Sequence, residues 1–132
     1  PKTYPVYYQT FRIFVELILL FTFYKNIIPK TATFEGWNFD ILIGISAPFM
    51  AYFVFRPSSK LLFLAKAWNI LGIFMVLFVA FIIATSFYQP QIWGSETVLV
   101  DFDFVRRPYL LIAGFLAPSA IFMHVVSLMQ LR

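Results

Sequence analysis

Three ionisable side chains lie inside otherwise apolar stretches of this chain. Glu16 is the only acid in such a stretch, and Arg12 lies one helical turn before it, which would place both on one helix face. His124 is the single histidine. An ionisable group within a lipid-facing segment is costly, so it marks either a proton, ion or ligand site or a polar contact that holds helices together.

Glu16 and His124 are expected at similar depth. Each lies about eight residues from the same end of its apolar run, or about 12 Å at a helical rise of about 1.5 Å. The two side chains could therefore meet, and Asn69, near the start of the third run, could reach them. Arg12, Glu16, Asn69 and His124 are the candidate residues for ligand or proton binding. The alternative is that they form a satisfied polar clasp between helices.

A second polar group is expected at the opposite end of the molecule. It consists of Glu35, Asn38, Asp40, Asp101, Asp103, Arg106 and Arg107. Asn38 is a good N-cap for the second helix, and the alternation V-D-F-D-F-V predicts an extended segment that lies on the bundle. This outer cluster is either a solvated rim with ion pairs or a pocket under Trp37 and Trp93. Such a pocket could bind a lipid headgroup, a small polar solute or, through carboxylate oxygens, a divalent cation.

Several classes of chemistry find no support in the sequence. The chain has no cysteine, which excludes disulfides and thiolate chemistry, and one histidine with one carboxylate falls short of a transition-metal site. Phosphate-binding loops, dinucleotide fingerprints and the common hydrolase motifs are absent as well. We therefore predict no catalytic residues and no metal site, and the residues specify no cofactor.

The composition predicts an integral membrane protein. Of 132 residues, 61% are hydrophobic and only 12% are charged, and no soluble domain of this size can bury so much apolar surface. The net charge of +4 is not gathered into a basic tract or face, so we expect no nucleic-acid partner. The positive net charge is better explained by the basic residues that orient a protein in a membrane.

Four apolar runs predict a single all-α domain over residues 1–132, a polytopic four-transmembrane-helix bundle. We place the helices at residues 7–28, 39–55, 67–87 and 109–131, with bends near Pro48 and Pro118. More basic residues flank the ends near the termini than the opposite ends, which predicts that both termini are cytoplasmic. The basic residues on the terminal side are Lys2, Arg12, Arg56, Lys60, Lys66 and Arg132, against Lys25, Lys30, Arg106 and Arg107.

The stretch F-E-G-W-N-F-D-I-L at residues 34–42 and A-W-N at residues 67–69 resemble a group of small bacterial four-helix membrane proteins. In that group, a stretch of the form F-E-G-x-N-F-D-I-L opens the second helix. The resemblance implies a multi-pass protein of the bacterial inner membrane, and it implies no mechanism.

Two function hypotheses follow. The first is an interaction protein, either an accessory subunit of a membrane complex or a homo-oligomer, because four short spans enclose little interior. The alternative is a binding or transport module for a lipid, quinone or small solute, with the Arg, Glu and His side chains at its site. An enzyme is a third possibility that no motif supports.

Overall fold

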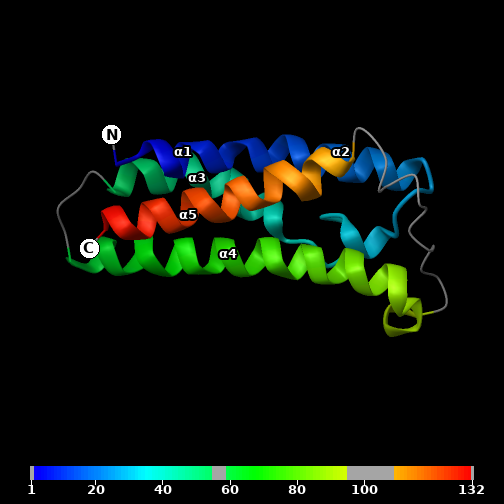
Figure 1. Ribbon diagram of the computed structural model, residues 1–132. Helices are drawn as coiled ribbons and strands as arrows, with labels where there is room; N and C mark the ends of the chain where they lie inside the picture. Colours follow the sequence, from blue (N-terminus) through cyan, green and yellow to red (C-terminus); the bar gives the residue numbers. More distant parts are fainter. Residues whose placement is uncertain (1, 55–58, 95–108, 132) are drawn as a thin grey trace.

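The computed structural model describes residues 2–54, 59–94 and 109–131, and most of these are helical. The first helix runs from Tyr4 to Tyr24 as α1 (Tyr4–Tyr8), the 3-10 turn η1 (Gln9–Phe11) and α2 (Arg12–Tyr24). After it come the 3-10 turn η2 (Lys30–Ala32), α3 (Asp40–Val54), α4 (Ser59–Tyr88), the 3-10 turn η3 (Pro90–Trp93), the π-helical segment η5 (Ile112–Leu116) and α5 (Ala117–Gln130). Both chain ends lie at the same end of the bundle (Figure 1).

Among the described residues, three helices are long and apolar enough to cross a membrane. They are Tyr4–Tyr24, Leu61–Tyr88 and Ile112–Gln130. The helix α3 is shorter, with 15 residues, and at about 1.5 Å per residue it is about 22 Å long, less than the roughly 30 Å of a hydrocarbon core. The expected all-helical fold is thus confirmed for the described residues, and three of its helices are long and apolar enough to cross a membrane, while α3 is shorter than a full span.

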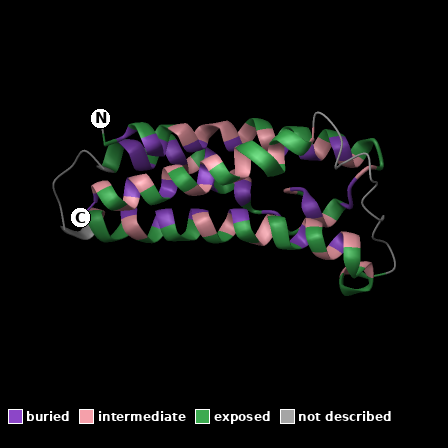
Figure 2. Ribbon diagram, viewed as in Figure 1, coloured by how far each residue is buried: buried purple, intermediate pink, exposed green. Residues whose placement is uncertain are grey.

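The distribution of side chains is that of a protein solvated by lipid. Large apolar residues point outward along every long helix; Phe14, Phe63 and Phe122, for example, are 68%, 76% and 62% exposed. Several of the most completely buried side chains are polar, among them Arg12 and His124 at 1% and 0% exposed. Figure 2 shows the exposed residues along the outer faces of the helices and the buried residues along the faces where they meet.

The packing of the bundle places α3 against the first helix and α4. α3 contacts α1, η1, α2 and α4, while α5 contacts α1 and α4. Small residues permit close approach, since a Cβ atom at Gly44 would lie 3.0 Å from Ile13 Cγ1. One apolar cluster, which includes Val6, Ala47 and Ala65, fills the end of the bundle near the termini.

The chain folds back into the bundle after the first helix. The helix ends at Tyr24 with Lys25 as its C-cap, and Asn26 takes a left-handed conformation with φ 57°. The segment then returns along α2 and α4, with Ile28 and Ala32 buried against Leu19 and Ile82 (Figure 1). Its continuation into α3 therefore begins inside the bundle rather than at its end.

The returning segment forms hydrogen bonds within its own backbone, as a buried non-helical segment requires. Thr33 N donates to Lys30 O at 2.9 Å, Trp37 N to Thr31 O at 3.1 Å, and Asn38 N to Thr33 O at 3.2 Å. A Cβ atom at Gly36 would collide with the backbone of Lys30 and Thr31. Glycine is therefore needed at this position for the tight fold.

The observed helix bounds differ from the predicted ones in two places. The first helix ends at Tyr24 instead of residue 28, because the returning segment takes up the last apolar residues of the run. The helix α4 begins at Ser59, eight residues before the predicted position, so that Lys60 and Lys66 extend the helix rather than occupy a loop. The V-D-F-D-F-V segment lies outside the described residues.

Candidate functional site

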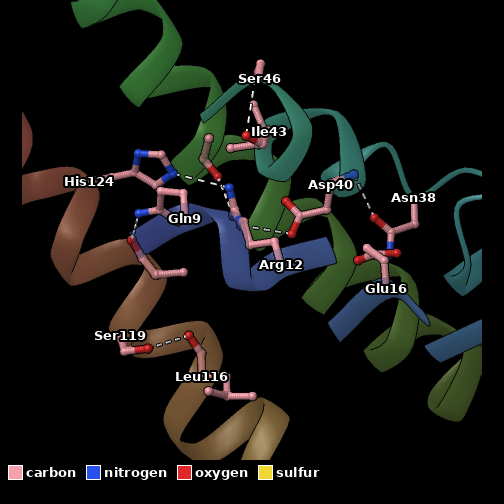
Figure 3. A network of polar contacts seen from close by, with 12 residues as sticks. Gln9, Arg12, Glu16, Asn38, Asp40, Ile43, Ser46, Leu116, Ser119 and His124 are labelled. Carbon is pink, nitrogen blue, oxygen red and sulfur yellow. Dashed lines mark hydrogen bonds and ion pairs between the residues drawn. The ribbon is translucent and has the colours of Figure 1, made fainter. Parts of the chain in front are cut away.

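Arg12 lies at the centre of a buried set of polar contacts between the helices (Figure 3). Its Nη1 donates to His124 Nε2 at 3.2 Å, its Nη2 donates to the carbonyl of Gly72 at 3.0 Å, and its Nε lies 3.0 Å from Asp40 Oδ2. The guanidinium thus connects the first helix to α3, α4 and α5. Nη1 and Nη2 thus donate hydrogen bonds within the protein, while Nε meets Asp40 in an ion pair without a hydrogen bond.

His124 connects α5 to α4. Its Nδ1 lies 2.9 Å from Asn69 Oδ1, while the Asn69 amide nitrogen donates to the carbonyl of Ala65 at 2.8 Å. Since Arg12 can only donate to Nε2, both contacts are satisfied by the neutral tautomer that carries its proton on Nδ1. The ring also meets Trp68 edge-on, with ring centroids 5.2 Å apart. These partners fix the position and orientation of the imidazole.

Glu16 joins the same set through Asn38, which lies just before the start of α3. Both of its carboxylate oxygens accept hydrogen bonds from Asn38 Nδ2, at 2.9 and 2.8 Å, and the same nitrogen donates to Ala32 O at 3.0 Å. Asn38 Oδ1 accepts a hydrogen bond from the backbone nitrogen of Asp40 at 2.9 Å. The predicted N-cap is thus confirmed, and it also carries contacts between elements.

We call this connected set the polar layer; its side chains are those of Arg12, Glu16, Asn38, Asp40, Asn69 and His124. The layer is buried far from the ends of the bundle. Glu16 lies eight residues before the end of α2, or about 12 Å along the helix axis. It holds two carboxylates and one guanidinium, with a neutral imidazole. Asp40 Oδ1 is buried and accepts no hydrogen bond from the described residues.

A cavity of about 220 Å³ opens beside the polar layer. It lies between α2, α4 and the junction of η5 with α5, and most of its wall is apolar. Small side chains give it room, notably Ala80, Ala84, Ala113 and Ala117. Arg12, Glu16 and Asp40 are its charged lining residues. A π-helical segment forms part of the wall, and such segments are frequent at functional sites.

The structure brings together all four residues of the first predicted group, although in a different arrangement. Glu16 and His124, which could have met at one depth, form no direct hydrogen bond: His124 pairs with Arg12 and Asn69, while Glu16 pairs with Asn38. Equal depth placed the two side chains in one layer. Their directions around the helix axes decided their partners.

The second predicted group is divided. Asn38 and Asp40 do not belong to an outer rim, because the returning segment carries them into the polar layer. Glu35 remains outside, where it forms an exposed ion pair with Lys30 at 3.8 Å. Trp37 is exposed, and Trp93 donates from its Nε1 to Thr85 Oγ1 at 2.9 Å. The other members, Asp101, Asp103, Arg106 and Arg107, lie outside the described residues.

Two contributors to this region were not expected from the sequence. Gln9 donates from its Nε2 to Ala120 O at 3.0 Å and ties the first helix to α5. Gly72 offers its carbonyl to Arg12 and leaves space for the imidazole, since a Cβ atom there would overlap the His124 ring. Gln9 lies one turn before Arg12 on the same helix face, and this spacing could have predicted its place in the polar region. The sequence does not predict the role of Gly72, because a single glycine in an apolar helix has no pattern that indicates a polar contact.

Within the described part of the chain, no three His, Asp or Glu side chains are grouped so that they could hold a metal ion. The polar layer can instead hold a proton or contact a polar group of a molecule in the cavity. Comparison of the chain with protein-family models, curated proteins and solved structures finds no match.

Proposed function

We propose that this protein is a membrane-embedded binding module for a small molecule with an apolar body and one polar group. The observation that carries the proposal is the cavity of about 220 Å³, whose wall is apolar except where it meets Arg12, Glu16 and Asp40. Apolar pockets with a few convergent polar groups are the usual form of small-molecule sites.

The size and position of the cavity agree with this function. A cavity of about 150 Å³ lined by apolar side chains is enough to bind benzene, so the larger volume here fits a somewhat larger molecule or part of a lipid. Ala80, Ala84 and Ala113 line the cavity and are also exposed on the bundle surface. A ligand dissolved in the bilayer can therefore enter from the side.

The test is to block the cavity. Ala80→Phe places a phenyl ring in the wall of the cavity, and Ala67→Phe makes the same change at an exposed position of α4 that does not line it. We expect wild type and Ala67→Phe, reconstituted with a native lipid extract, to retain a bound small molecule in native mass spectrometry, and Ala80→Phe to lose it. Identical spectra for the three proteins would contradict the proposal.

We further propose four helices within the membrane, both termini in the cytoplasm and an inner-membrane location. Without Arg12, which is buried in the bundle, five basic residues remain on the side of the termini against four on the other. Cysteines introduced at Lys2 and Lys25, at opposite ends of the first helix, test the orientation. An impermeant thiol reagent added outside spheroplasts should label only the cysteine at position 25; labelling only of position 2 would reverse the topology.

The accessory-subunit hypothesis stays a prediction. The exposed aromatic side chains of the helices can face lipid or partner helices equally well. A particle in mild detergent with the mass of one chain, and no copurifying subunit, would count against it.

A further inference from the structure

The charge of the cavity wall is unbalanced. Among the described residues that line it, Glu16 and Asp40 are acids and Arg12 is a base, while His124 in the same layer is the neutral tautomer. An unbalanced carboxylate is costly in a low-dielectric environment. A proton or another cation must therefore neutralise it.

Asp40 offers a specific contact point for that cation. The residue is 7% exposed and lines the cavity; its Oδ2 pairs with Arg12, while its Oδ1 is buried and lacks a donor among the described residues. Carboxylate oxygens accept hydrogen bonds and cannot donate them when ionised. A ligand that satisfies Oδ1 must therefore carry a donor.

Anionic ligands fit the layer poorly. Each nitrogen of the Arg12 guanidinium already has a partner, namely His124, Gly72 or Asp40. A bound carboxylate or phosphate would add a negative charge beside Glu16 and Asp40, which already outnumber Arg12 among the described lining residues. A neutral donor satisfies Oδ1 but leaves the excess charge.

We propose that the cavity binds a monovalent organic cation, an amine with an apolar body, whose ammonium group donates to Asp40 Oδ1 while its hydrocarbon part fills the alanine-lined space. This inference rests on the proposed binding function and names the ligand class. In the absence of such an amine, a proton on the layer takes its place, so that binding of the ammonium releases a proton.

The test compares two probes of equal shape. Octylamine is an ammonium ion at neutral pH, and 1-octanol has the same chain and the same number of non-hydrogen atoms without the charge. Binding is measured for protein in lipid nanodiscs as the saturable difference between wild type and Ala80→Phe, which removes partitioning into lipid from the signal. We expect octylamine to bind about tenfold more tightly than 1-octanol or better, as a charge-assisted hydrogen bond implies.

The Asp40→Asn variant tests whether Asp40 is the residue that gives the preference for octylamine over 1-octanol. In this variant, the amine should lose most of its advantage, so that the two probes bind within about threefold of each other. Full preference for octylamine in a folded Asp40→Asn variant would overturn the assignment. If the variant does not fold, the comparison of the two probes on the wild-type protein still decides the ligand class.

The remaining outcomes separate the two proposals. Equal affinity of both probes for wild type, lost in Ala80→Phe, would overturn the cation inference and leave the binding function in place. If Ala80→Phe binds octylamine as tightly as wild type does, and 1-octanol as tightly as well, both proposals fail.

Discussion

Gly72→Ala tests whether the buried layer is built as described. Gly72 lies in the middle of α4, where a Cβ atom would overlap the Nε2 and Cε1 atoms of His124. The imidazole cannot turn aside easily, because Asn69 and Arg12 hold its two nitrogens and Trp68 packs against the ring. A single methyl group should therefore push the ring away and break its contact with Arg12.

The expected magnitude follows from three contributions. Overpacking a tight site costs about 1–3 kcal/mol. Loss of a hydrogen bond to a charged group costs about 1.5–3 kcal/mol. The better helix propensity of alanine returns about 1 kcal/mol. We expect Gly72→Ala to lower the free energy of unfolding by roughly 2–4 kcal/mol, measured by titration with sodium dodecyl sulfate in mixed micelles.

Gly114→Ala is the matched control, because a Cβ atom at Gly114 would meet no heavy atom of the described residues within 4 Å. It should leave the free energy of unfolding unchanged or raise it by up to about 1 kcal/mol through helix propensity. If Gly72→Ala is as stable as Gly114→Ala, the imidazole does not lie against Gly72, and the described geometry of the layer is wrong.

The remaining predictions concern the charges and the pairing within the layer. Arg12→Met should lower the free energy of unfolding by about 3–5 kcal/mol, because it leaves two buried carboxylates without their cation. Adding Asp40→Asn to this variant should restore part of the lost stability. If the second change restores none of it, Asp40 does not depend on Arg12. In double-mutant cycles, Asn69→Ala and His124→Ala should couple by about 0.5–3 kcal/mol, since the two side chains are hydrogen-bonded. Glu16→Gln and His124→Ala should show a smaller coupling energy, because the two side chains share no direct contact. A larger coupling energy for this pair than for Asn69 and His124 would contradict the observed partners.

The sequence by itself determined the class of the fold and the depth of its polar residues. The apolar composition predicted helices long enough to cross a membrane, because helices satisfy their own backbone in lipid. Counting residues along the runs placed Glu16 and His124 at one level, and the structure does place them in one layer. The cap at Asn38 was also predictable, because its side chain competes for the free backbone groups at a helix start.

Only the tertiary structure decided which side chains pair. Position along a helix fixes depth, but partners depend on the rotation and crossing of each helix, so Glu16 met Asn38 and His124 met Arg12. The returning segment moved Asp40 from an expected rim into the core. This was not predictable, because a polar loop at the surface and one folded into the bundle have the same local sequence signals. The cavity likewise exists only where α2, α4 and η5 diverge, since a space between helices depends on how far apart their backbones lie.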